Sequence, residues 1–233
     1  MTQYFAGIDI GSTMTKAVIL EEGVIASVIG PTGPEQRRLA NKVMEEALRK
    51  AGLSFDSMTY IVSTGYGRIN VPFADKQVTE ISCHAKGVSS LFPQARTIVD
   101  IGGQDSKAIT IDNNGRVTNF IMNDKCAAGS GRFVEVIADT VGLKLEQMGD
   151  VSLQSTSPAQ ISNICTIWAQ QEVAARLAEG TPVPDLIAGV HRSLADRVAS
   201  GAALLGKELY QKALRQNQPL ETRPRVLETV QIL

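Results

Sequence analysis

Two segments of this chain, about 90 residues apart, carry the same residue pattern. Residues 5–18 read FAGIDIGSTMTKAV, and residues 97–110 read TIVDIGGQDSKAIT. Each segment holds an Asp-Ile-Gly triplet, a polar turn, and a lysine seven residues after the aspartate. A repeat over this distance is typical of a duplicated structural unit. We therefore predict two similar lobes that face each other across a cleft.

The two repeated segments are predicted to be β-hairpins whose turns suit the phosphate groups of a nucleotide. In the first, Gly11 allows close backbone approach, and Ser12 and Thr13 supply hydroxyls. Asp9, at the strand end, is suited to a hydrated Mg²⁺. For one such turn, ordinary polar turn chemistry explains the residues equally well. The matched second copy, with Asp100 at its strand end, favours phosphate binding.

The remaining pattern predicts an α/β fold. The first part reads as three strands, a helix and a further strand, which together form a mixed sheet with the helix on one face. Strands are predicted at 4–10, 15–20, 24–29, 60–64, 97–110 (two strands with a turn) and 117–122, and helices at 35–51, 75–91, 131–141, 162–179 and 184–205. We place the lobes at residues 1–94 and 95–206, and an atypical tail at 207–233.

Composition excludes several classes of function. The net charge is −1 and aromatic residues make up 5% of the chain, which argues against nucleic acid or an anionic membrane as the main partner. No apolar stretch approaches the roughly 18 residues of a membrane span, and the N-terminus does not read as a signal peptide. We expect a cytoplasmic protein.

Three cysteines are too few for a disulfide framework, and the chain has no CxxC pair. Cys126 lies in the stretch NDKCAAGSGRF just before a predicted helix, and Cys165 lies near the start of another. The helix dipole favours the thiolate form that binds metal. For an isolated cysteine, however, a buried thiol in a glycine-rich turn is the more common case. Cys83 is interpreted as a core thiol.

Glu80 and His84 share one face of the predicted helix 75–91. A pair at this spacing can bind metal or form a structural contact. The structural interpretation is favoured because no third ligand is evident.

With these residues in hand, the chain resembles the ATP-dependent activators of 2-hydroxyacyl-CoA dehydratases, which group with the ATP-binding subunits of benzoyl-CoA reductase. The resemblance covers most of residues 4–200 in the family's order. The matching motifs are GIDIGSTMTKAV (7–18), STGYGR (63–68), ADKQVTEISCHAKG (74–87), VDIGGQDSKAI (99–109), NDKCAAGSGRFVEV (123–136) and CTIWAQQEV (165–173). The family has the actin, Hsp70 and sugar-kinase fold, with two RNase-H-like lobes around a nucleotide.

The resemblance implies an ATP-hydrolysing electron-transfer protein. Its homodimer would share one 4Fe–4S cluster, with Cys126 and Cys165 as the two ligands from each chain. Reduced ferredoxin or flavodoxin would load the cluster. ATP hydrolysis would then drive transfer of one low-potential electron to a 2-hydroxyacyl-CoA dehydratase, an aryl-CoA reductase or a related double-cubane-cluster protein.

The resemblance also assigns roles at the nucleotide. Asp9 and Asp100 would hold Mg²⁺ and orient the attacking water, and Glu80 would assist from between the lobes. The expected phosphate-binding residues are Gly11, Ser12, Thr13 and Lys16 in the first hairpin, and Gly102, Gly103, Gln104 and Lys107 in the second.

The sequence departs from the family's pattern in two places. Trp168 and Gln170 stand where the family usually has phenylalanine and an acidic residue. After Ala199-Ser200-Gly201 we find no Gly-Gly adenosine-binding loop, so we expect an incomplete second lobe and an absent or replaced adenosine site.

Two other functions fit the same fold. One is a kinase for a small alcohol or acid, with Asp100 or Glu80 as the base and both cysteines incidental. The other is a remnant that dimerises or binds nucleotide without turnover.

Overall fold

The computed structural model describes residues 2–162 and 164–215, with side chains up to Leu204. Contacts divide the chain into two compact units, with the boundary between Phe92 and Pro93. We call them unit 1 (residues 1–92) and unit 2 (residues 93–233). In the part of the chain that is described, no helix is long and apolar enough to cross a membrane.

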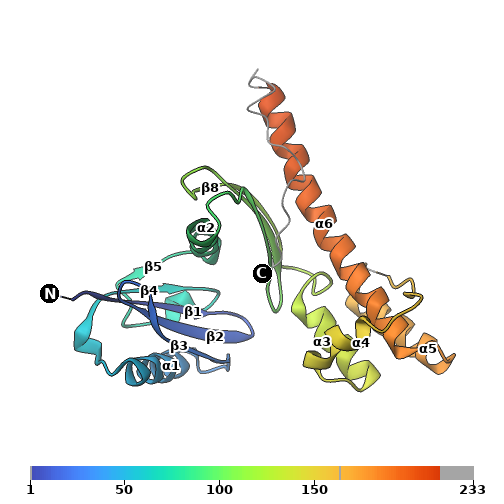
Figure 1. The fold of residues 1–233 in the computed structure, drawn as a ribbon, viewed down its shortest axis with the longest axis horizontal. Helices are drawn as coiled ribbons and strands as arrows, with labels where there is room; N and C mark the ends of the chain where they lie inside the picture. Colours follow the sequence, from blue (N-terminus) through green and yellow to red (C-terminus); the bar gives the residue numbers. More distant parts are fainter. Residues whose placement is uncertain (1, 163, 216–233) are drawn as a thin grey trace. The chain divides into compact units, whose positions relative to one another are not determined.

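Unit 1 contains a five-stranded mixed sheet in the order β3-β2-β1-β4-β5 (Figure 1). β1 runs antiparallel to β2 and parallel to β4. Alternation of apolar and polar residues along β1 and β2 buries one face of each strand, as the sequence pattern predicts. The strands are β1 (Tyr4–Ile10), β2 (Met14–Leu20), β3 (Val24–Pro31), β4 (Met58–Thr64) and β5 (Lys76–Gln77).

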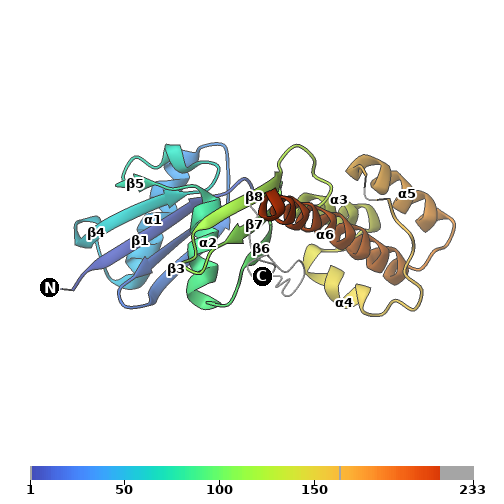
Figure 2. The same cartoon turned by 90° about the horizontal axis from the view of Figure 1, so that it is seen from above.

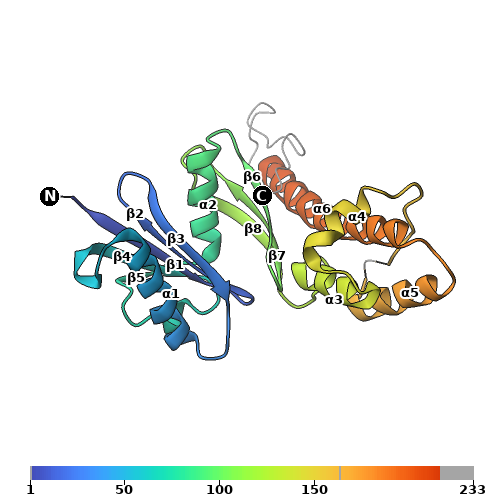
Figure 3. The same ribbon diagram turned by 60° about the horizontal axis from the view of Figure 1, so that its bottom comes forward.

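Helix α1 (Gln36–Ala51) covers one face of this sheet (Figure 3). Its apolar residues recur at helical spacing and are buried against the strands, with Met44 and Ala47 fully inaccessible. The helix ends at Gly52, whose φ of 69° is the left-handed conformation that glycine adopts without steric cost. The predicted helix at 35–51 is therefore confirmed to within one residue.

The predicted helix 75–91 begins later than the sequence pattern indicated. Helix α2 spans Glu80–Leu91, and the Thr79 side chain accepts a hydrogen bond from the Ser82 amide at 3.3 Å. Asp75 instead pairs with β4, because its carboxylate accepts from the Ile61 amide at 2.7 Å and its own amide donates to the Ile61 carbonyl. These long-range bonds draw residues 76–77 into β5 rather than into a helix.

Short 3₁₀ turns occur at Phe55–Ser57 and Arg68–Asn70.

Unit 2 combines a three-stranded antiparallel sheet, in the order β6-β7-β8, with a helical cluster (Figure 2). Helices α3, α5 and α6 share a core around Phe133, Ile137, Val173 and Leu186. The strands are β6 (Thr97–Ile101), β7 (Ser106–Ile111) and β8 (Val117–Asn123). The helices are α3 (Gly131–Val141), a 3₁₀ turn at Leu145–Gln147, α4 (Met148–Ser152), α5 (Thr166–Ala178) and α6 (Val183–Arg215).

Two helix boundaries in unit 2 differ from the prediction. Helix α5 begins at Thr166 rather than at Ser162, because the Ser162 amide donates to the Glu172 carboxylate at 3.0 Å and holds this segment outside the helix. Helix α6 continues past Leu205 to Arg215, since the run of helix-forming residues after Gly206 has no proline. The first part of the predicted tail is therefore helical, and residues 216–233 lie outside the described residues.

Candidate functional site

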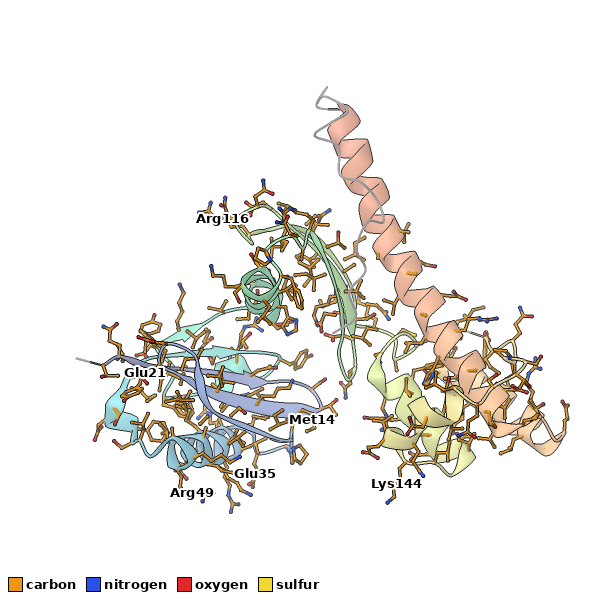
Figure 4. The ribbon with its side chains drawn as sticks, viewed as in Figure 1. Met14, Glu21, Glu35, Arg49, Arg116 and Lys144 are labelled. Carbon is orange, nitrogen blue, oxygen red and sulfur yellow. The ribbon has the colours of Figure 1, made fainter. Side chains whose placement is uncertain are left out.

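Hairpin 1 (β1–β2) places its aspartate and lysine directly opposite each other. Asp9 and Lys16 are register partners, and their carboxylate and ammonium groups lie 2.9 Å apart. The Gly11 amide donates to the Met14 carbonyl at 3.1 Å, so Ser12 and Thr13 form the tip of the hairpin. Figure 4 labels Met14 at this end of β2. The Lys16 side chain is 42% exposed and remains accessible to a further anion.

The Gly65–Gly67 turn after β4 packs directly on hairpin 1. Gly65 has φ of 85°, and any side chain there would overlap the Asp9 carboxylate and the Ile10 carbonyl. The Gly67 amide donates to the same Ile10 carbonyl at 2.8 Å. The glycines of the STGYGR motif thus let a second backbone segment approach Asp9 closely.

Glu80, at the start of α2, is connected to this turn through Arg68. The Arg68 guanidinium lies 3.5 Å from the Glu80 carboxylate and donates to the Gly65 carbonyl at 2.9 Å. Three of the sequence motifs in unit 1, those around Asp9, Gly65 and Glu80, therefore form one cluster. In the described residues, no group of three His, Cys, Asp or Glu side chains could hold a metal ion.

Hairpin 2 (β6–β7) has the same register and a more buried lysine. Asp100 faces Lys107 across the strands, and the Gly102 amide donates to the Asp105 carbonyl at 2.9 Å. The Lys107 ammonium lies 2.8 Å from Asp105 and 3.4 Å from Asp100, and its side chain is 3% exposed. Burial acts to lower the pKa of Lys107, but the Asp105 hydrogen bond and the charges of both aspartates outweigh burial and raise that pKa above 10.5.

The first turn of α3 is hydrogen-bonded to the tip of hairpin 2. The Gly131 amide donates to the Gly102 carbonyl, and the Arg132 amide donates to the Gly103 carbonyl, both at 2.8 Å. These are two of the amides that a helix start leaves without an intrahelical partner. The predicted phosphate-binding turn is therefore fixed to the segment that follows Cys126.

The Cys126 segment (residues 123–130) is held by side chains that bond its backbone. The Asn123 amide group donates to the carbonyls of Cys126 and Ala128, at 2.9 and 3.0 Å. The Ser130 hydroxyl donates to the Ala127 carbonyl at 2.7 Å. Cys126 itself is half-buried with a free thiol.

Cys165 is the N-cap residue of α5, with extended backbone and a free, half-buried thiol. The side chains around it are exposed and apolar: Ile164 is 65% exposed, Ile167 62% and Trp168 60%. Gln170 is exposed as well, whereas Ala169 points into the core. Both predicted metal-binding cysteines are therefore accessible near a helix N-terminus of unit 2.

Three residues of the site were not singled out from the sequence: Arg68, Asp105 and Asn123. Both Arg68 and Asn123 lie within the quoted motifs. Arg68 contacts Glu80 in a different motif, whereas Asn123 binds carbonyls of its own segment, through a loop conformation that residue periodicity does not predict. Asp105 was detectable in principle, because alignment of the repeats places this carboxylate opposite Met14.

Comparisons with known proteins identify the family. The activator of lactoyl-CoA dehydratase from Anaerotignum propionicum is 47% identical over 210 residues, which cover 87% of this chain and 78% of that protein. The (R)-2-hydroxyglutaryl-CoA dehydratase component A of Acidaminococcus fermentans superposes with a TM-score of 0.83 at 41% identity, covering 87% of this chain and 78% of that one.

A third similar protein is the activator of the 2-hydroxyisocaproyl-CoA dehydratase from Clostridium difficile, solved with bound ADPNP. It superposes with a TM-score of 0.82 at 44% identity, covering 87% of this chain and 76% of that chain. These superpositions confirm the predicted actin-like α/β fold. The BadF/BadG/BcrA/BcrD ATPase family matches residues 6–209. The chain therefore belongs to the BadF/BadG/BcrA/BcrD ATPase family, as its sequence motifs predicted.

Proposed function

We propose that this protein hydrolyses ATP to drive a low-potential electron into a 2-hydroxyacyl-CoA dehydratase or a related CoA-ester reductase. The observation that carries the proposal is the pair of hydrogen bonds from Gly131 and Arg132 to the hairpin 2 tip, which join a phosphate-type turn to a cysteine segment. Relatives named as dehydratase activators support the acceptor class. Neither the kinase nor the remnant alternative has support of this kind.

The nucleotide site is proposed at the two hairpins. Asp9 and Asp100 would hold Mg²⁺ and orient the attacking water, with Glu80 assisting through Arg68. Mg²⁺ commonly uses one or two carboxylates together with phosphate oxygens and water, so a dedicated three-ligand cage is not required. The proposed phosphate ligands are Gly11, Ser12, Thr13 and Lys16, and Gly102, Gly103, Gln104 and Lys107.

The two cysteines fit one half of a 4Fe–4S site. Cys126 and Cys165 are free thiols, and each residue is half-buried. Cys165 is the N-cap of α5, where the helix dipole favours the thiolate, and Cys126 precedes Ser130, the N-cap of α3. A four-thiolate set then requires Cys126 and Cys165 from a second copy, which makes the active form a homodimer. When bound, the cluster supplies one-electron redox chemistry at low potential.

Coupling between the two sites follows from the described hydrogen bonds. A nucleotide that shifts the Gly102–Gly103 backbone also shifts the amides of Gly131 and Arg132, which donate to it. Because Ser130 and Asn123 bind the backbone of the Cys126 segment, this displacement reaches Cys126.

The proposed electron donor is a reduced ferredoxin or flavodoxin, and the acceptor is the dehydratase or reductase component. Trp168 and Ile167 supply an exposed apolar surface beside Cys165. This position suits contact with a protein that exchanges electrons there.

The test is iron and acid-labile sulfide per chain after anaerobic reconstitution, together with phosphate release from ATP. We expect about two irons per chain in a dimer, lost in Cys126→Ser and Cys165→Ser but retained in the matched control Cys83→Ser. Iron-free protein with both thiols still titratable would exclude the redox role, and turnover of ATP only with a small alcohol or acid would favour a kinase.

A further inference from the structure

One arginine of α6 contacts both cysteine segments. Gly129 has φ of 97°, and the Arg197 side chain covers it: a Cβ built on Gly129 would lie 3.1 Å from Arg197 Cδ. The guanidinium Nη1 of the same arginine lies 3.5 Å from the Ile164 carbonyl, one residue before Cys165. A single side chain thus spans from the Cys126 segment to the start of α5.

The position of Arg197 places a permanent positive charge between these segments. Arginine stays protonated at all accessible pH values, and its half-buried side chain is screened less than a fully exposed one. It also lines a cavity of about 310 Å³ that includes Lys107 of hairpin 2 and Asn123 of the Cys126 segment. The charge therefore lies beside the backbone segments that carry both cysteines.

We infer that Arg197 is a positioning residue for the thiolate site, with two effects. Its stem and guanidinium hold the Cys126 segment and the start of α5 in fixed relation before any metal binds. Its charge stabilises the more negative, reduced form of a group bound by Cys126 and Cys165. This inference extends the proposed function to the control of the site's potential.

The charge of Arg197 determines the direction in which its removal changes the reduction potential. Reduction adds one negative charge, and a nearby cation favours it. Removal of Arg197 should therefore lower the reduction potential. We expect the ratio of reduced to oxidised protein at a fixed donor potential to fall about tenfold, which is 59 mV for a one-electron couple.

The positioning effect is measurable without metal. We expect amide hydrogen exchange in apo Arg197→Met to become about tenfold faster both at residues 126–131 and at residues 164–168, because both lose the same anchor. Arg116→Met is the matched control: Arg116 is exposed and precedes β8, at the opposite end of that strand from Asn123, so neither segment should change.

The experiment compares the full-length protein with Arg197→Met, Arg197→Lys and Arg116→Met, using redox titration of the reconstituted dimer and hydrogen exchange of the apo form. Arg197→Lys keeps the charge, so its potential should stay near that of the wild type. If Arg197→Met does not fold, Arg197→Gln tests the same loss of charge.

The outcomes separate this inference from the proposed function. A wild-type chain that binds no iron refutes the redox function, while exchange in the apo protein still decides whether Arg197 joins the two segments. Unchanged exchange in Arg197→Met refutes the positioning role. An unchanged potential in a folded, loaded Arg197→Met or Arg197→Gln refutes the electrostatic role.

Discussion

Hairpins 1 and 2 have the same strand register, but their lysines differ in burial and in the number of carboxylate partners. In hairpin 1, Lys16 has a single carboxylate partner and is 42% exposed, whereas in hairpin 2, Lys107 has two partners and is 3% exposed. The second carboxylate partner comes from one position of the turn, where Asp105 corresponds to Met14. An exposed ammonium can reach a phosphate at little cost, whereas Lys107 must first leave Asp105. The two copies of the motif therefore differ: the lysine of hairpin 1 is accessible to a ligand, and the charge of the hairpin 2 lysine is neutralised by aspartates of the same hairpin.

The largest predicted effect is on ATP hydrolysis, and it tests whether both hairpins serve the nucleotide. We expect Asp9→Asn and Asp100→Asn each to lower kcat by about 10²-fold, because each removes a carboxylate proposed to hold Mg²⁺ and water. Phosphate release under saturating ATP measures the change.

Asp56→Asn, which alters an exposed carboxylate elsewhere in unit 1, is the control and should change kcat less than about twofold. Comparable losses in both aspartate variants would support two functional hairpins. A loss confined to Asp9→Asn would make hairpin 2 a structural element.

The second prediction compares the backbone segments packed on the two hairpins. At Gly65, φ is 85° and a methyl group would overlap the Asp9 carboxylate. At Gly131, a Cβ would lie 3.3 Å from the Gly102 carbonyl, which a small shift accommodates. We expect Gly65→Ala to destabilise unit 1 by about 2–4 kcal/mol, and Gly131→Ala to change unit 2 by less than about 1 kcal/mol.

Urea unfolding followed by circular dichroism measures both changes, and Gly23→Ala, in an open turn, is a control for alanine itself. Equal destabilisation by Gly65→Ala and Gly131→Ala would mean that the two hairpins are equally crowded, contrary to the described backbone contacts.

The sequence predicted most of the fold because the deciding information is local. The Asp-to-Lys spacing specifies the register of both hairpins, and apolar periodicity with Gly142 in the left-handed conformation defines α3. The sequence pattern predicts α2 and α5 to begin too early, because Ile61 in β4 and Glu172 within α5 bind the residues that precede the two helices. Helical periodicity carries no information about such partners.

The candidate site was predictable to the extent that its residues lie in motifs. Arg197 lies outside the quoted motifs, far along the chain from Gly129, and its role depends on the packing of α6. Arg68 was within a motif, but its link from Glu80 to Gly65 required the structure.

The smallest predicted effect comes from exchanging the residues at the turn position where Asp105 corresponds to Met14. Asp105→Met removes the nearer partner of a buried ammonium and leaves Asp100, so we expect unit 2 to lose about 1–3 kcal/mol. Met14→Asp adds a carboxylate beside the exposed Lys16, where ion pairs contribute little, and should change unit 1 by less than about 0.5 kcal/mol. Fluorescence of Trp168, the single tryptophan, monitors unit 2, and circular dichroism monitors the whole chain.

The pH dependence of the stability loss in Asp105→Met shows whether the charge of Lys107 causes that loss. The pKa of Lys107 is raised in the folded protein, so its pairing contributes fully below about 10.5, the ordinary value, and is lost as pH rises through the higher folded pKa. The stability difference between wild type and Asp105→Met should therefore stay constant from neutral pH to about 9 and shrink above about 10.5. Urea midpoints between pH 7 and 11.5 measure it. A difference that persists at pH 11.5 would assign the loss to packing of the Asp105 side chain rather than to the charge of Lys107, and the two hairpins would then differ in shape rather than in electrostatics.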